Sequence, residues 1–326
     1  MFIRVCAMDT NEPYSNDTLA HESSACTHTF GHTLCAILIH DASHSQTRIK
    51  GAIMSKQSNA APLPTYSDIE KLPEQWDLYK KLVSGVPEGI AVKDFLLGDH
   101  WVLVEAESGF GMGLNVHGGS GPFRLNNSIV GMELRDLAAL STSWNFQEAS
   151  VGVAALNAWY STPENAEAAG MKIEAKGIND AFDLYQELCC GKKVTIVGHF
   201  PLIERLADEC ELTILERDPH GDDVPDPGCE YIIPYQDYTF MTGITLTNKT
   251  MPRLLSLAKQ GKSSVILVGP SVVPSPILYD YGVDCMAGSV VADPERARAA
   301  IAHAEHSGIF KCGVQKMRIE RPGWLD

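Results

Sequence analysis

The sequence contains no long run of apolar residues. The longest one near the amino terminus, residues 34–39, lies between His32 and His40 and is far shorter than the roughly 20 residues that span a bilayer. A basic segment followed by an apolar core, as in a secretory signal, is also missing. These absences argue against a membrane or secreted protein, and we expect a cytoplasmic location.

Basic residues are scarce and scattered. The chain has 26 Lys and Arg against 41 Asp and Glu, which gives a formal net charge of -15. Nucleic-acid binding depends on neutralising phosphates with Lys and Arg, so we predict no nucleic-acid partner. An acidic exterior of this kind usually serves solubility.

Paired cysteines are missing as well. The nine cysteines are an odd number, and no two of them form a CxxC pair. In a cytoplasmic protein a disulfide framework is not expected. We predict that most of these cysteines are buried as small apolar side chains.

Residues 1–65 differ from the rest of the chain. They hold five of the eleven histidines and show no sustained helical or strand period, so we predict a disordered extension, with Met54 as an alternative start. Four zinc-type ligands fall within ten residues of this segment: Cys26, His28, His32 and Cys35. Zinc fingers separate their two ligand pairs by a longer structured spacer, so this crowded pattern does not predict a zinc site.

A length of 326 residues is typical of about two domains. The first predicted domain, residues 66–162, is small and of α+β type. Its expected elements are a helix at 74–83, strands at 92–97, 101–106 and 111–116, and helices at 133–140 and 147–160. Small residues in the last helix indicate close packing. Residues 163–178 are expected to connect this domain to the next.

The second predicted domain, residues 179–326, alternates strands and helices. The expected strands are 193–197, 212–216, 238–241, 264–268 and 284–287, with an extra extended run at 230–233. The expected helices are 180–189, 202–209, 249–259 and 294–303. Alternation of this kind indicates a doubly wound parallel sheet, so the predicted fold class is α/β.

Each predicted strand of this sheet ends in polar or glycine-rich residues. A parallel sheet brings these ends to one edge, where ligands bind. The candidate ligand-binding residues on this edge are Gly198, His199, Phe200, Pro201, Glu216, Thr242, Gly243, Thr245, Asn248, Gly269, Pro270 and Ser271. From the small domain, His117 and Gly118 belong to a glycine-rich loop that could cover the same edge as a lid.

The turn after the first strand departs from a dinucleotide-binding motif. Gly198 is the only glycine of a would-be GxGxxG, and Phe200 stands where the second glycine would admit a pyrophosphate. Ordinary NAD or FAD is therefore disfavoured. Glu216 is placed to hold ribose hydroxyls or is a solvated strand-end carboxylate. His199 is a candidate metal ligand, acid/base or anion donor, or it merely caps the helix.

A series of motifs resembles a known family. It consists, in order, of residues 197–201, 215–216, 242–248, 267–271 and 280–288. The series resembles the heavy-metal chelation domain family, a domain of unknown function with a Rossmann-like fold. The segments 117–119 and 143–157 resemble its usual companion, a small domain similar to the enolase N-terminal fold. The resemblance spans roughly residues 76–318 and implies an interdomain cleft and a role with a metal or a metal-chelating small molecule.

Three hypotheses for function follow. The first is a protein that binds or processes a small polar ligand, such as a metal chelate, and holds this ligand between the two domains. The second is an enzyme that uses a nucleotide or an S-adenosylmethionine-like cofactor. The third is a non-catalytic structural or interaction protein. Whether the protein is an enzyme, whether it needs a metal ion as cofactor and whether it forms a homo-oligomer stay open.

Overall fold

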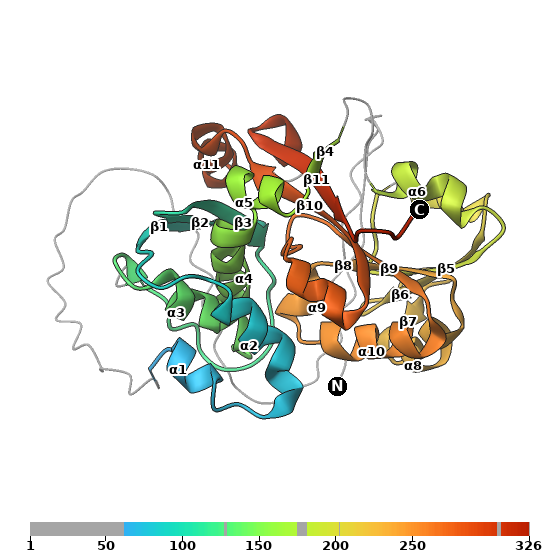
Figure 1. Ribbon diagram of the computed structural model, residues 1–326, viewed down its shortest axis with the longest axis horizontal. Helices are drawn as coiled ribbons and strands as arrows, with labels where there is room; N and C mark the ends of the chain where they lie inside the picture. Colours follow the sequence, from blue (N-terminus) through green and yellow to red (C-terminus); the bar gives the residue numbers. More distant parts are fainter. Residues whose placement is uncertain (1–61, 127–128, 175–180, 202, 305–307, 326) are drawn as a thin grey trace, which may run out of the picture. The chain divides into compact units, whose positions relative to one another are not determined.

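The computed structural model describes residues 62–326, apart from 127–128, 175–180, 202, 305–307 and 326 (Figure 1). The predicted extension lies outside these residues except for its last four positions. Met54 and the Cys26–Cys35 pattern also lie outside them. The described residues belong to one compact unit and form two separate β-sheets.

The smaller sheet is an antiparallel meander in the order β1-β2-β3. Its strands are β1 (Val92–Leu97), β2 (Trp101–Ala106) and β3 (Gly109–Leu114). The third strand lies two residues earlier than predicted. It ends at Leu114 because the backbone N–H groups of Leu114 and Val116 are bonded to the side chains of Ser271 and Ser150.

Four α-helices flank this meander in the sequence. They are α1 (Tyr66–Ile69), α2 (Asp77–Ser84), α3 (Leu134–Ala139) and α4 (Phe146–Tyr160). Helix α4 packs on the sheet (Figure 1). A Cβ atom on Gly111 would lie 2.0 Å from the backbone nitrogen of Ala158, and one on Gly152 would lie 2.0 Å from that of Ser141. The close packing predicted from the small residues is therefore confirmed.

The expected connection, residues 163–178, contains regular structure. It holds α5 (Pro163–Ala168) and β4 (Lys172–Ile173). Strand β4 is the edge strand of the larger sheet and pairs antiparallel with β11 (Val314–Glu320), the last strand of the chain. The chain is thus tied to the edge of that sheet before its first central strand begins.

The larger sheet has eight strands in the order β4-β11-β10-β9-β8-β5-β6-β7. Its remaining strands are β5 (Lys193–Val197), β6 (Glu211–Glu216), β7 (Val224–Pro225), β8 (Tyr238–Thr242), β9 (Ser264–Val268), β10 (Val283–Val291) and β11 (Val314–Glu320). The strands from β10 to β7 pair in parallel, and β11 pairs antiparallel. The predicted α/β class is confirmed, with an antiparallel edge that was not predicted.

The two faces of this sheet bury different helices. The helices of this part of the chain are α6 (Ala181–Cys189), α7 (Glu204–Ala207), α8 (Cys229–Ile232), α9 (Ile244–Thr247), α10 (Met251–Gly261) and α11 (Pro294–Ala302). Of these, α11 packs against β1 and β2 of the smaller sheet. Side chains alternate along a strand, so Ile196 packs with α6 whereas Val197 packs with α10. Figure 1 shows α6 and α10 on opposite sides of the strands.

One predicted element is wrong in type. Residues 230–233 were expected to be extended, but they belong to α8 and to a 3-10 turn, Ile233–Tyr235. A 3-10 turn with Pro227 near its start, Asp226–Gly228, leads directly into α8. Proline in the first turn favours helix because its φ is already helical.

A buried ion pair fixes the loop that precedes α3 to the start of α4. The Glu148 carboxylate has no exposed surface and accepts hydrogen bonds from the backbone N–H of Arg124 at 2.7 Å, from the Arg124 guanidinium at 2.6 Å and from the Ser143 hydroxyl at 2.7 Å. Burial opposes ionisation, but these hydrogen bonds outweigh it and hold the pKa of Glu148 below its usual value.

We expect Glu148→Gln to destabilise the protein by about 3–5 kcal/mol at pH 7, because it removes the charged acceptor of a buried ion pair. The difference from the wild type should shrink as pH falls through the lowered pKa of Glu148, since protonation removes the same charge. Urea unfolding of both proteins at several pH values measures this difference in the free energy of unfolding. Exposed Glu167→Gln is the control, and equal stability of the two variants at pH 7 would contradict the assignment.

Candidate functional site

A cavity of about 1170 Å³ opens at the carboxyl ends of β5, β6, β8 and β9. It is slightly larger than the roughly 300–1,000 Å³ of common small-molecule sites. The predicted residues that line it are Gly198, His199, Phe200, Pro201, Glu216, Thr242, Thr245, Asn248, Gly269, Pro270, Ser271, His117 and Gly118. Gly243 does not line it; a Cβ there would lie 2.5 Å from the backbone nitrogen of Val272. The ligand-binding role of these residues stays a prediction.

The turn after β5 is held by its glycine and its phenylalanine. Gly198 has φ +102°, a conformation that other residues rarely adopt. The Phe200 ring packs edge-on against Phe182 of α6, with 5.2 Å between ring centroids. The Nδ1 atom of half-exposed His199 lies 3.5 Å from a carboxylate oxygen of Asp223, which is almost buried. Asp223 was not predicted, and it is placed to orient the imidazole.

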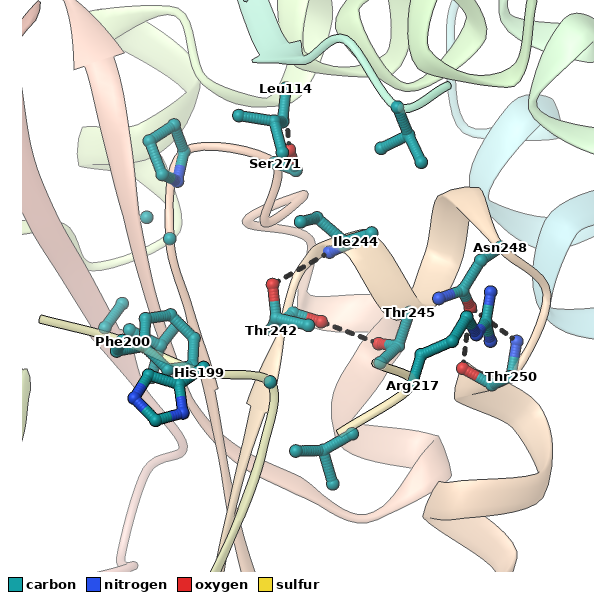
Figure 2. Close-up of a pocket in the computed structure, with 18 of the residues that line it drawn as sticks. Leu114, His199, Phe200, Arg217, Thr242, Ile244, Thr245, Asn248, Thr250 and Ser271 are labelled. Carbon is teal, nitrogen blue, oxygen red and sulfur yellow. Dashed lines mark hydrogen bonds between the residues drawn. The ribbon is translucent and has the colours of Figure 1, made fainter. Parts of the chain in front are cut away.

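Four polar side chains hold the loops after β8 and β9 (Figure 2). The hydroxyl oxygens of Thr242 and Ser271 accept hydrogen bonds from the backbone N–H groups of Ile244, at 3.3 Å, and Leu114, at 2.8 Å. The Thr245 hydroxyl donates to the Thr242 carbonyl at 2.7 Å. The last member, Asn248, is bonded within its own turn.

The Asn248 side-chain oxygen accepts two hydrogen bonds from Thr250, one from its backbone N–H at 3.1 Å and one from its hydroxyl at 2.7 Å. In these hydrogen bonds the side-chain oxygens of Asn248, Thr242 and Ser271 act as acceptors. Their N–H and O–H groups have no acceptor among the described residues. These three cavity-lining side chains therefore offer hydrogen-bond donors.

The glycine-rich loop is fastened to the start of α4. The backbone N–H of Phe146 donates to the Gly118 carbonyl at 3.2 Å, and that of Ser120 donates to the Trp144 carbonyl at 2.8 Å. Gly119 has φ +78°, and a Cβ atom on it would lie 2.1 Å from the Trp144 carbonyl oxygen. Only glycine fits this position. The loop held in this way contributes His117 and Gly118 to the cavity wall.

Glu216 and Arg217 end β6 at the cavity. A Glu216 carboxylate oxygen accepts a hydrogen bond from the Arg217 backbone N–H at 2.7 Å. The Arg217 guanidinium donates to Asp226 at 2.8 Å. Both residues line the cavity, so the end of this strand contributes one carboxylate and one ion-paired guanidinium to the lining.

Lys249 is one of the cavity residues that the sequence did not reveal. It lies between α9 and α10 with φ +72°, an uncommon conformation for a residue other than glycine. Its ammonium nitrogen lies 5.9 Å from the centre of the Tyr79 ring and 5.8 Å from that of Phe146. It donates to the Thr247 carbonyl at 2.6 Å. Burial lowers the pKa of Lys249 to about 7.

The donor set around the cavity is not that of a metal cage. In the part of the chain that the structure describes, no three His, Cys, Asp or Glu side chains are grouped to hold a metal ion. Soft heavy metals prefer thiolates, and the cavity has one cysteine, Cys229. Burial raises the pKa of that thiol and so disfavours its thiolate.

We expect Lys249→Met to stabilise the protein near pH 6, because the variant no longer buries an ammonium group. In the wild type this cost is present below pH 7 and is relieved as pH rises toward about 10.4, the ordinary pKa in the unfolded chain. The stability advantage of the variant should therefore fall across that interval, by up to about 1.4 kcal/mol per pH unit.

Thermal unfolding from pH 6 to pH 10 measures the advantage. Lys262→Met is the matched control, since Lys262 is exposed and has φ +60°. A Lys249→Met advantage that does not change with pH would contradict the assignment of a desolvated amine.

Comparison with known proteins gives related chains over both sheets. Residues 180–320 match the DUF364 family and residues 79–160 match the DUF4213 family; both are described as "Putative heavy-metal chelation". A crystal structure of a DUF364 protein of unknown function from Desulfitobacterium hafniense is 35% identical, with a TM-score of 0.70, and covers 76% of this chain and 99% of its own.

Two further relatives are more distant. A DUF364 structure from Pyrococcus horikoshii, 24% identical with a TM-score of 0.62, covers the same shares of the two chains and has the same fold. An uncharacterised protein of Methanocaldococcus jannaschii is 28% identical over 256 residues, 73% of this chain and 93% of its own length. From the matched segments and the 35% identity to a structure that is covered almost completely, the chain belongs to the DUF364 family.

Proposed function

We propose that the protein binds a small, oxygen-rich anionic ligand, an organic chelator or its metal complex, in the cavity at the carboxyl edge of the large sheet. The observation that carries the proposal is the set of polar side chains there. Thr242, Asn248 and Ser271 bond to the backbone through their oxygens and keep O–H and N–H donors for a ligand. Lys249 adds a further donor.

Donors of this kind suit carboxylate oxygens. A hydrogen bond to a charged acceptor contributes about 1.5–3 kcal/mol, more than one between neutral groups. Chelators such as polycarboxylates present several such oxygens at once. The family description concerns chelation, and a ligand that carries its own metal needs no metal cage made by the protein.

The proposal places this site in a cleft between two domains. The meander with its helices would be the predicted enolase N-terminal-like domain, and the large sheet would be the Rossmann-like domain. The parallel strands β7-β6-β5-β8-β9-β10 have the order 3-2-1-4-5-6 of that fold. His117 and Gly118 would then form the predicted lid. The boundaries at residues 162 and 179 belong to the proposal.

A nucleotide or S-adenosylmethionine-like cofactor is the second candidate. It is favoured by Glu216, which ends the second parallel strand and lines the cavity, the place of a ribose-binding carboxylate in this strand order. Gly198 supplies the tight turn, but Phe200 fills the position of the glycine that admits a pyrophosphate. In this alternative His199, oriented by Asp223, acts as acid or base.

We expect citrate or nitrilotriacetate, alone or with Zn²⁺ or Ni²⁺, to stabilise the protein in thermal-shift and calorimetric titrations. At 100 times the dissociation constant the gain is about 2.7 kcal/mol. Adenosine and S-adenosylmethionine form the second arm. Stabilisation by the nucleosides alone, lost in Glu216→Gln, would favour the second candidate. If no member of either arm binds, the third hypothesis, a structural or interaction protein, gains ground.

We expect Asn248→Asp to weaken chelator binding at least about tenfold. The substitution keeps the oxygen that holds Thr250 but replaces the donor by an anion, so a charge-assisted hydrogen bond is lost. Gln315→Glu, an exposed position outside the cavity, adds the same charge and should bind as the wild type does. Equal affinity of all three proteins would overturn the placement of the ligand.

A further inference from the structure

Lys249 combines an unfavourable backbone conformation with a place in the cavity wall. Its φ of +72° belongs to the left-handed region, which a residue with a Cβ occupies at a cost and which clusters at functional sites. Two residues earlier, the Thr247 hydroxyl is buried without a hydrogen-bond partner among the described residues. Neither feature is needed to join α9 to α10, where a glycine or asparagine would serve.

The walls around the amine are aromatic and uncharged. Tyr79 comes from α2 and donates its own hydroxyl to the Leu246 carbonyl at 2.7 Å, which fixes its ring beside Lys249. Phe146 begins α4 and holds the glycine-rich loop through its backbone N–H. The amine therefore lies close to two aromatic rings, and Lys249 belongs to the lining of the cavity.

The charged groups on the packing helices are engaged elsewhere. On α2, Asp77 is bonded to Lys81 and Tyr281. On α4, Glu148 is bonded to Arg124 and Ser143. Burial alone accounts for the lowered pKa of Lys249, so a larger fraction of its amine is neutral at pH 7 than in an ordinary lysine. For an ordinary lysine the neutral fraction is on the order of 1 in 1,000.

A neutral lysine in an apolar pocket is a nucleophile toward carbonyl carbon. We propose that Lys249 forms a Schiff base with the aldehyde or ketone group of a small acid bound in the cavity. The inference rests on the proposed function, since it assigns a carbonyl group to the ligand of that site. The inference adds a covalent step to binding. In this step Thr242, Asn248 and Ser271 hold the acid group of the ligand while Lys249 reacts with its carbonyl carbon.

The step balances without a co-reactant. The nitrogen lone pair of Lys249 attacks the carbonyl carbon, and the carbonyl oxygen takes up a proton to give a carbinolamine. Loss of the hydroxyl together with the remaining amine proton, as water, leaves the C=N bond. The reaction is reversible, and hydride addition to the imine carbon by borohydride makes the link permanent.

The first measurement compares lysines within the wild-type full chain. Limiting formaldehyde and cyanoborohydride are added from pH 6 to pH 10, and the methylation rate of each lysine is followed by peptide mass spectrometry. We expect Lys249 to react at least about tenfold faster than exposed Lys262 at pH 7 and the ratio to fall toward pH 10. A ratio of one or less at pH 7 would overturn the proposal.

The second measurement uses glyoxylate, a two-carbon aldehyde with a carboxylate, trapped with cyanoborohydride at pH 7. We expect the adduct to map to Lys249, to be absent from Lys249→Arg and to be unchanged in Lys262→Arg. Labelling spread over the exposed lysines, without excess at Lys249, would overturn the covalent step.

These results separate the two proposals. Citrate binding to a protein whose Lys249 is unreactive would leave the proposed binding site intact and remove the Schiff base. Glyoxylate trapping at Lys249 in a protein that binds no chelator would keep the covalent step and remove the chelator as ligand.

Discussion

The reversal of chain direction at β5 is the constraint on which the site depends. Strand β5 pairs in parallel with β6 on one side and with β8 on the other. The chain therefore leaves β5 toward β7 and later returns to extend the sheet from β8 to β10. Loops that leave the carboxyl ends of β5 and β8 diverge, and an opening at such a reversal is where open α/β sheets bind ligands.

Side chains in the loops around this opening hold the backbone with their oxygens and leave their hydrogen-bond donors unused within the described part of the chain. Ser271 accepts the Leu114 backbone N–H and thereby joins the loop after β9 to the end of β3. Thr242 and Asn248 accept the backbone N–H groups of Ile244 and Thr250 and thereby hold the turns within the loop after β8. A buried N–H left unpaired would cost about 1–3 kcal/mol, so these oxygens are committed to the fold. What remains for a ligand is the donor half of each group.

The sequence allowed the central strands to be predicted because they are short, β-branched runs that end in glycine or polar residues. The ends of these strands gave eleven of the residues that line the cavity. Strand β11 was missed because its side chains alternate between buried and exposed without the turn signals that mark the other strands. The composition of residues 230–233 is typical of a strand. They are mostly helical because the proline-containing turn Asp226–Gly228 leads directly into α8.

Lys249 could not have been predicted from the sequence, and the reason is physical. A lysine after an asparagine in a polar turn is ordinary; its burial depends on Tyr79 and Phe146, which lie more than 100 positions earlier in the chain. Pairing at this distance leaves no periodic pattern. The only local signal would have been the left-handed backbone, and that too depends on Asn248 holding the turn.

The surroundings of Lys249 join the two segments that match separate families. Tyr79 and Phe146 belong to residues 79–160, whereas Lys249 and the donor side chains of the β8 and β9 loops belong to residues 180–320. The amine on the second segment lies 5.9 and 5.8 Å from the centres of two aromatic rings of the first, and these rings help to exclude water from it. The chemistry we assign to the cavity is therefore a property of the joined chain, which gives a physical reason for the two segments to occur together.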